Sequence, residues 1–202
     1  QHPTLRRQRQ MCIRDSDTGP HSSVLVGSGR VFNLLTLKRC DNEIGSVRGI
    51  MAVGWAVFRN YVGHAKEILG DVTDYPRFFL MPPSALVEAD QEGNNVIALS
   101  SAEDHIDHEV ELVIRLGDDL MPAEMCVGND TTNRTRQTLA KKKGWPWLEG
   151  KGFAGSGVLG TWTAWNPSPV EIGLSVNGEV RQQASTELMV HSVESILSHL
   201  KD

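Results

Sequence analysis

The segment from Asp107 to Leu116 constrains the fold of this chain more than any other stretch of its sequence. Side chains alternate between the two faces of a β-strand. The alternation places four apolar residues on one face: Val110, Leu112, Ile114 and Leu116. Glu109 and Glu111 fall on the other face, with backbones roughly 6.5–7 Å apart. We therefore predict a strand that buries one face and presents paired carboxylates on the other.

Carboxylates at this spacing suit a metal site, although the pattern alone does not require one. Glu109 and Glu111 can both reach one hard cation, and Mg²⁺ prefers a few carboxylates together with water and substrate oxygens. The simpler interpretation of the same residues is a strand face that is exposed to solvent and carries two glutamates. Asp130 adds a third acid in Gly128-Asn129-Asp130, at a predicted turn before a helix. Acids at helix starts are ordinarily caps, but this one strengthens the metal interpretation.

Two predicted helices carry polar side chains at spacings that suit catalysis. Arg134, Gln137 and Lys141 recur at i, i+3 and i+7 and form one stripe. Arg134 is placed to hold an anionic oxygen and Gln137 to hydrogen-bond a carbonyl, while Lys141 is interpreted as part of an exposed face. His64 and Glu67 are neighbours on a helical turn. A carboxylate beside an imidazole makes it a better base, and an ordinary surface pair is the alternative.

Short strand-like runs dominate the chain, and helical signals are few. The strand-like runs are Val24–Val26, Val31–Lys38, Gly49–Val53, Arg77–Met81, Asn95–Leu99, Glu109–Leu116, Val170–Val176 and Glu179–Gln183. Asn177-Gly178, between the last two, is typical of a type I′ hairpin. The predicted helices are Asn60–Leu69, Thr131–Lys143 and Glu187–Leu200. Because strands and helices do not alternate regularly, the sequence predicts an α+β fold rather than a doubly wound sheet.

Composition excludes several classes of protein. The chain has 202 residues, with 20 Lys+Arg against 25 Asp+Glu and a formal net charge of −5, which argues against a nucleic-acid binder. It lacks an apolar run of about 18 residues, so we expect no membrane span. Cys12, Cys40 and Cys126 are odd in number and far apart, which favours a reducing compartment and a cytoplasmic location. The letters G-x-G-x-x-G at 155–160 lack the following helix that a dinucleotide fingerprint needs.

Five segments, in this order, resemble the fumarylacetoacetate hydrolase family, and most closely its short acylpyruvate hydrolase and oxaloacetate decarboxylase branch. The family pattern consists of G-R-N-Y-x-x-H-x-x-E, H-E-x-E-L, N-D-x-T-x-R-x-x-Q, a lysine before G-F or A-F, and a hairpin N-G-x-x-R-Q. The corresponding stretches are Arg59–Glu67, His108–Leu112, Asn129–Gln137, Lys151–Phe153 and Asn177–Gln182. The match extends from about residue 49 to residue 202. Five motifs in the same order are far more specific than any one of them.

The resemblance implies a mixed β-sandwich roll of the C-terminal domain type of that family, with few short helices, in a homodimer. It also assigns roles to the polar residues. Glu109, Glu111 and Asp130 would bind Mg²⁺ or Mn²⁺. Arg134, Gln137 and Lys151 would hold the 2-oxo acid substrate, with Lys151 also stabilising an enolate. His64 and Glu67 would orient or activate the attacking water.

The implied activity is that of a metal-dependent hydrolase or decarboxylase that cleaves a C–C bond in acylpyruvates or oxaloacetate-like 2-oxo acids. Such a cleavage passes through an enolate, which a divalent cation and Lys151 can stabilise. Two alternatives remain open. One is a decarboxylase or isomerase of dicarboxylic intermediates of aromatic catabolism, an activity found in the same family. The other is an inactive fragment or a non-catalytic metal-binding scaffold.

The chain also departs from the family pattern. Trp55–Phe58 separate Gly54 from Arg59, next to the expected site, and these apolar residues are placed to cover a substrate. The family's closing G-T-P-x-G-V-G loop does not occur before Asp202, so we expect the intact gene product to be an enzyme and this C-terminally truncated chain to be inactive. The expected divisions are an artefactual or disordered tail at 1–16, N-terminal strands at 17–48 and a catalytic domain at 49–202.

Overall fold

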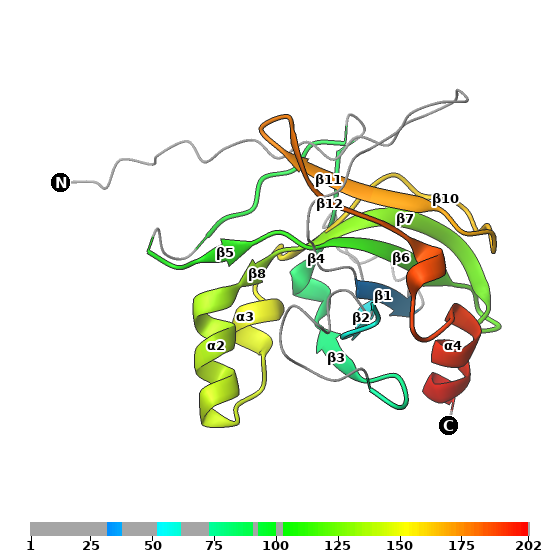
Figure 1. Cartoon of the computed structure of the whole chain (residues 1–202), viewed down its shortest axis with the longest axis horizontal. Helices are drawn as coiled ribbons and strands as arrows, with labels where there is room; N and C mark the ends of the chain where they lie inside the picture. Colours follow the sequence, from blue (N-terminus) through cyan, green and yellow to red (C-terminus); the bar gives the residue numbers. More distant parts are fainter. Residues whose placement is uncertain (1–31, 38–51, 62–72, 91–92, 100–102, 202) are drawn as a thin grey trace, which may run out of the picture.

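The computed structural model describes residues 32–37, 52–61, 73–90, 93–99 and 103–201, the first range as backbone alone. Strands predominate in this part of the chain (Figure 1). The strands of the main sheet are β1 (Phe32–Leu37), β2 (Val53–Val57), β3 (Phe78–Met81), β4 (Leu86–Glu88), β6 (Val110–Leu116), β7 (Pro122–Asp130), β9 (Gly157–Leu159) and β10 (Thr163–Ala164). Two smaller pairs join β5 (Ile106–Asp107) to β8 (Thr132–Asn133) and β11 (Glu171–Val176) to β12 (Glu179–Ser185).

The main sheet is mixed and rolled. Among the described residues its order is β3-β2-β1-β6-β7-β9-β4, with β10 paired to β7. The β1–β6 and β4–β9 pairs are parallel, and the other pairs are antiparallel. The edge strands β3 and β4 are separated along the chain only by Pro82–Ala85, which includes the short helix η1 (Pro83–Ala85). Because neighbouring strands lie about 4.8 Å apart, so short a connection requires the sheet to curl until its edges approach.

Both faces of the rolled sheet are covered. The inner cluster consists of Ala56, Met81, Ala85, Leu86, Val113, Cys126 and Leu159. The outer cluster packs the other face of β6 against β11 and the C-terminal helix α4 (Val193–Lys201), through Ile172, Leu174, Ile196 and Leu197. Figure 1 shows the β11–β12 hairpin lying across β6 and β7. Each fully buried aliphatic side chain contributes about 1.5–3 kcal/mol, so these two clusters hold the layers together. The architecture is the expected α+β roll with few short helices.

The alternation predicted for the carboxylate strand is confirmed. Val110, Leu112, Ile114 and Leu116 all belong to the outer cluster. Val113 lies on the opposite face, in the inner cluster. The Asn177-Gly178 hairpin is confirmed as well, because it joins β11 to β12 with φ of 54° and 83° at its two central residues. Positive φ at both positions is the signature of a type I′ turn.

Several local expectations need correction. The helix predicted from Thr131 begins at Arg134, as α2 (Arg134–Lys143), because β8 pairs with β5 before it. Its N-cap is Asn133, whose side chain accepts a hydrogen bond from the Arg136 amide at 3.0 Å. The last helix similarly begins at Val193, after the 3₁₀ turn η2 (Thr186–Leu188). The segment 95–99, expected as a strand, is described and contains none.

Other expectations concern the start of the chain and the histidine helix. Asn60 and Tyr61 are not helical, since Tyr61 forms a β-bridge with Met189. The rest of the helix predicted to Leu69, and the tail 1–16, lie outside the described residues. Of the strand expected at Gly49–Val53, residues 49–51 lie outside the described residues and Ala52 is not in a strand; the observed strand β2 begins at Val53. Within the described residues, no helix combines the length and apolar character that crossing a bilayer requires.

Three of the four residues Trp55–Phe58 are part of the main sheet, and their role in covering a substrate stays a prediction. Trp55, Ala56 and Val57 lie in β2, with Ala56 and Val57 fully buried. Trp55 packs edge-on against Phe78 of the neighbouring strand. Phe58 alone follows the strand, and its ring contacts Trp147 at 5.6 Å between centroids. Strand packing therefore explains the apolar character of Trp55, Ala56 and Val57.

Candidate functional site

Three carboxylates converge where β6 and β7 pair. Glu109 directly precedes β6, Glu111 lies within it, and Asp130 is the last residue of β7. The antiparallel register sets Val110 opposite Asn129, so Glu109 and Asp130 meet at the end of the ladder. Asp130 therefore ends a strand, whereas the sequence predicted a turn before a helix. All three side chains are buried, and one carboxylate oxygen from each lies within 4.8 Å of the others.

Hydrogen bonds fix the backbone on both sides of Glu109. The Glu109 amide donates to Asn129 Oδ1 at 3.1 Å, and the Asp130 amide donates to the Glu109 carbonyl at 2.9 Å. Gln182 of β12 reaches across from the hairpin. Its Oε1 accepts from the Val110 amide at 2.7 Å, and its Nε2 donates to the carbonyl of the residue before Glu109 at 3.0 Å. Hydrogen bonds from β7 and from the β11–β12 hairpin therefore hold the backbone on either side of Glu109.

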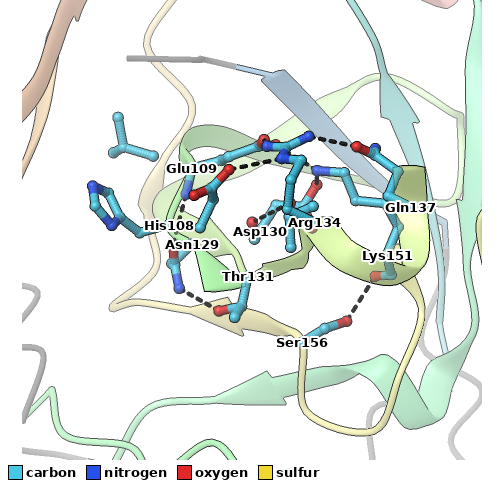
Figure 2. Close-up of polar contacts among 12 residues, drawn as sticks. His108, Glu109, Asn129, Asp130, Thr131, Arg134, Gln137, Lys151 and Ser156 are labelled. Atoms are coloured by element: carbon cyan, nitrogen blue, oxygen red, sulfur yellow. Dashed lines mark hydrogen bonds and ion pairs between the residues drawn. The ribbon is translucent and has the colours of Figure 1, made fainter. Parts of the chain in front are cut away.

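Lys151 projects its ammonium group into the carboxylate cluster (Figure 2). It ends the short helix α3 (Leu148–Lys151), and its side chain is 1% exposed. Nζ donates to Glu109 Oε2 and, at 2.5 Å, to Asp130 Oδ2. The Ser156 hydroxyl donates to the Lys151 carbonyl at 2.8 Å, which fixes the backbone after the helix. The glycine-containing segment 155–160, which the sequence excluded as a dinucleotide site, thus supports Lys151 through Ser156 and contains β9.

A close approach between two helices sets the position of Lys151. A Cβ added to Gly150 would lie 2.8 Å from Gln137 Cβ and 2.9 Å from Gln137 Cα. At such distances any other residue at position 150 would force the neighbouring backbone to shift. This contact lets α3 lie directly on α2, so that the next residue, Lys151, enters the buried space beside Asp130.

The site shifts the pKa values of its ionisable groups in different directions. Burial raises the pKa of Asp130 to about 6, and the nearby Glu109 charge adds to this against the opposing effect of Lys151. Burial also acts to raise the pKa of Glu109, but Lys151 and Arg134 outweigh it and lower that pKa. For Lys151, burial acts downward while Asp130 and Glu109 raise the pKa, and the net direction is upward. Lys151 is therefore an ammonium at neutral pH.

Arg134 and Gln137 lie at the same site, as the helical spacing predicted. Arg134, the first residue of α2, donates from Nη2 to Glu109 Oε1 at 2.6 Å and from Nε to Asp107 Oδ2 at 2.7 Å. Its Nη1 donates to Gln137 Oε1, and Gln137 is buried. Each of the three guanidinium nitrogens thus has a protein acceptor in this structure. Lys141, interpreted as exposed, is on the surface, with Nζ 4.9 Å from the centre of the Trp147 ring.

Six of the eight predicted site residues meet in the structure. They are Glu109, Glu111, Asp130, Arg134, Gln137 and Lys151. The other two, His64 and Glu67, lie outside the described residues. Sequence reasoning assigned no role to Asp107, Asn129, Gly150 or Gln182. Asp107 had a usable signal, because it precedes Glu109 by two residues in the same alternation.

The chemistry of the three acids fits a divalent cation. Mg²⁺ binds oxygen ligands at about 2.0–2.1 Å, so oxygens on opposite sides of the ion lie about 4.2 Å apart. Three oxygens on one ion cannot all lie opposite one another, so the acid oxygens, which lie within 4.8 Å of one another, would move closer together on binding it. Asp130 Oδ1 is buried and accepts no hydrogen bond from any described residue. A buried carboxylate oxygen of this kind is costly unless it gains a partner, and a cation is a suitable one.

Comparison with known proteins identifies the family. Residues 54–202 match the C-terminal family of fumarylacetoacetate (FAA) hydrolase. An uncharacterized protein of Pyrococcus abyssi is 35% identical over 159 residues, which cover 72% of this chain and 69% of that protein. The mitochondrial oxaloacetate decarboxylase of Dictyostelium discoideum is 32% identical over 167 residues, covering 76% and 73% respectively. A mitochondrial oxaloacetate tautomerase of Rattus norvegicus is 31% identical over 169 residues, covering 76% and 72%.

A solved structure agrees with this assignment at the level of the fold. The crystal structure of fumarylpyruvate hydrolase from Pseudomonas aeruginosa in complex with Mn²⁺ and pyruvate superimposes with a TM-score of 0.64 at 23% identity. The alignment covers 99% of this chain and 80% of that one. The expectation drawn from the five ordered motifs is confirmed: the chain belongs to the fumarylacetoacetate hydrolase family, whose named members include enzymes that act on 2-oxo acids.

Proposed function

We propose that this protein is a metal-dependent enzyme that forms and stabilises the enolate of an oxaloacetate-like 2-oxo acid or an acylpyruvate, whereas the inactivity expected for the 202-residue chain stays a prediction that the assays below test. The observation that carries this proposal is the buried group of Glu109, Glu111 and Asp130 with the Lys151 ammonium against two of its members. A bound divalent cation and a fixed positive charge beside it both stabilise the negative charge of an enolate. The names of the Dictyostelium and rat relatives add support for oxaloacetate.

The residues of this chain have distinct tasks in that chemistry. Glu109, Glu111 and Asp130 would hold Mg²⁺ or Mn²⁺, which supplies a Lewis-acid charge to the substrate oxygens. Lys151, an ammonium because its pKa is raised by Asp130 and Glu109 despite burial, stabilises negative charge that develops on the 2-oxo group. Arg134 and Gln137 orient the carboxylate and carbonyl of the substrate at the start of α2. The exclusion of water around these buried groups strengthens each electrostatic contact.

Decarboxylation and hydrolysis differ in their need for water. Loss of CO₂ from oxaloacetate gives the enolate directly, and no water attack is needed. Hydrolysis of an acylpyruvate requires a water to attack the acyl carbonyl, and we propose His64, with Glu67, as the base for that step. The motif comparison is the basis for that assignment. Tautomerisation, the activity named for the rat relative, needs enolate formation alone, so the site chemistry is common to all three.

The first test is the affinity of the chain for Mn²⁺ and for oxalate, which mimics the enolate of pyruvate. Calorimetry on the wild-type chain should show saturable binding of Mn²⁺, followed by oxalate binding that depends on the metal. Glu109→Gln/Glu111→Gln should bind neither, while retaining a cooperative circular-dichroism melt. Glu124→Gln, at a partly buried surface pair with Arg115, is the matched control and should bind both. A folded wild-type chain that binds no Mn²⁺ would reject the proposed metal site.

Substrate assays then separate the reactions. Oxaloacetate consumption, release of CO₂ and cleavage of acetylpyruvate are followed with the same Mn²⁺-loaded protein. Turnover of oxaloacetate that is lost in Lys151→Met supports the enolate role of Lys151. Metal binding without turnover of any of these compounds would instead support the alternative of a non-catalytic metal-binding scaffold. Turnover only of dicarboxylic intermediates of aromatic catabolism would favour the related decarboxylase or isomerase.

Three further features belong to the proposal. We take residues 49–202 as the catalytic domain, in line with the family match to 54–202. The protein is proposed to be a homodimer, which light scattering during size-exclusion chromatography would detect. It is proposed to work in a reducing compartment, because its three cysteines are odd in number and far apart in the sequence. The cytoplasm is the compartment proposed, although the decarboxylase and tautomerase relatives are named as mitochondrial.

A further inference from the structure

The row of acids at the site is longer than the metal-binding group. Asp107 precedes Glu109 by two residues, as Glu109 precedes Glu111. Glu109 and Glu111 belong to the group that could hold a cation, whereas Asp107 does not. Asp107 instead contacts Arg134, the same arginine that contacts Glu109. One guanidinium therefore bridges the first two acids of the row, and the cation site uses the last two.

The contacts of Arg134 differ along its guanidinium. Its Nε edge meets Asp107 Oδ2 at 2.7 Å, and Nη2 meets Glu109 Oε1 at 2.6 Å. The remaining nitrogen, Nη1, donates to Gln137 Oε1, one turn further along α2. A guanidinium is planar, so acceptors at different edges fix both its position and the orientation of its plane. A long arginine side chain held at one point alone would keep much of its rotational freedom.

Asp107 is itself well placed to serve as an anchor. It lies in β5, where it pairs with Thr132 of β8, immediately before the helix that carries Arg134. The His105 carbonyl accepts from the Arg134 amide at 2.8 Å, so the two segments are also joined through their backbones. The second Asp107 oxygen lies 3.0 Å from His105 Nε2. The Asp107 side chain is 30% exposed, against 0% for Glu109, so it sits at the rim of the site.

We propose that Asp107 is a positioning residue of the metal site, which acts through Arg134. By fixing the guanidinium, Asp107 keeps Glu109 Oε1 engaged and turns Oε2 toward Lys151 and Asp130, where the cation would bind. Asp107 also determines which edge of the Arg134 guanidinium faces Gln137 and the proposed substrate position. This inference rests on the proposed function, because it takes Glu109 as a metal ligand.

The expected effect is a loss of metal affinity without loss of the fold. Removal of a residue that orients a metal ligand typically weakens binding about 10–100-fold. Asp107→Ala should therefore raise the dissociation constant for Mn²⁺ about tenfold, measured by electron paramagnetic resonance of the free ion. Asp107→Asn, which keeps an acceptor for Nε but loses the charge, should fall between Ala and wild type. If Asp107→Ala fails to fold, the Mn²⁺ affinity of Asp107→Asn provides the test instead.

Asp104 provides a matched control on the same segment. It accepts from Arg136 Nε at 3.3 Å and from the helix cap Asn133 at 2.7 Å, and the ion pairs of Arg136 are with Asp104 and Glu149, outside the group of metal-binding acids. Asp104→Ala should lower the melting temperature by as much as Asp107→Ala or more, because it disturbs the cap of α2. Its Mn²⁺ dissociation constant should stay within twofold of wild type. Equal weakening in the two variants would overturn the proposal, since it would indicate a general structural effect.

A double-mutant cycle tests whether Asp107 acts through Arg134. Asp107→Ala/Arg134→Met should bind Mn²⁺ as Arg134→Met does, within twofold, because the anchor has no role once the guanidinium is gone. Additive losses would show that Asp107 acts directly and would overturn the inference. If the folded wild type binds Mn²⁺ and Asp107→Ala binds it equally well, only this inference fails. If the folded wild type does not bind Mn²⁺, the proposed function fails together with it.

Discussion

Lys151 Nζ lies 2.5 Å from Asp130 Oδ2, and the two side chains are 1% and 4% exposed. Breaking a buried ion pair of this kind strongly destabilises the folded protein, because removal of one partner leaves the other charge in a medium of low polarity. The same ammonium also contacts Glu109. The site therefore depends on Lys151 for its stability as well as for its proposed chemistry.

Lys151→Met should lower the free energy of unfolding by about 3–5 kcal/mol in metal-free buffer. Methionine fills much of the same space but leaves Glu109 and Asp130 without their shared cation. Urea denaturation followed by circular dichroism measures the change. Lys141→Met is the matched control, since Lys141 lies exposed over the Trp147 ring, and it should change stability by less than about 1 kcal/mol. Equal effects in the two variants would contradict the importance of the buried pair.

Metal affinity should rise with pH in the range where Asp130 loses its proton. Burial raises the pKa of Asp130 to about 6, so below that pH a cation must displace a proton from this carboxyl. The dissociation constant for Mn²⁺ should fall about tenfold between pH 5 and pH 7 for one such proton. Calorimetry at pH 5.5 in two buffers of different ionisation enthalpy should show proton release on binding. An affinity that is constant from pH 5 to pH 7 would contradict this prediction.

In the metal-free protein, the Asp130 carboxyl should contribute less to the free energy of unfolding as the pH rises. This trend is opposite to the rise of metal affinity with pH. The unfolded chain loses the Asp130 proton near its ordinary pKa of about 3.9, while the folded chain keeps it up to about pH 6. A raised folded-state pKa favours the folded state at low pH. The Asp130 contribution to the free energy of unfolding should thus decrease as the pH rises from about 4 to about 6. Chemical denaturation of wild type and Asp130→Asn across that window isolates it, and parallel curves would exclude the effect.

Gly150→Ala should weaken the site although position 150 carries no functional group. The added Cβ would lie 2.8 Å from Gln137 Cβ, so α3 must move away from α2 and carry Lys151 with it. Overpacking of this kind typically costs about 1–3 kcal/mol. We expect a lower melting temperature and a weaker Mn²⁺ affinity together. Retention of both would mean that the two helices separate without moving Lys151.

Gln182→Leu should loosen the backbone that presents Glu109. The side chain of Gln182 makes hydrogen bonds to the Val110 amide and the His108 carbonyl, and it is 4% exposed. Loss of these bonds leaves buried backbone groups without partners, at about 1–3 kcal/mol each. Gln183→Leu is the control on the neighbouring residue, because Gln183 Oε1 accepts no hydrogen bond from the described residues. Mn²⁺ affinity should fall in the first variant and stay unchanged in the second.

Much of the candidate site was predictable because it depends on short sequence separations. Glu109 and Glu111 share a face through the two-residue period of a strand, and Arg134 and Gln137 share one through helical spacing. Lys151 was identified only by its motif, since a single lysine carries no local pattern that predicts burial. Asp107, Asn129 and Gln182 were missed as supporting residues because their partners lie 27, 20 and 72 residues away along the chain.

The sequence by itself determined the features that local geometry controls. The alternation in β6 and the Asn177-Gly178 turn follow from steric preferences of a few adjacent residues. Tertiary structure decided the rest. Buried and exposed residues do not alternate cleanly along β7 (Pro122–Asp130), so its sequence does not show which face is buried. Only its pairing with β6 brings Asp130 to Glu109. Helix α2 starts at Arg134 because β8 first pairs with β5. Long-range pairing and burial, which no short window of sequence contains, assemble the acids and Lys151 into one site.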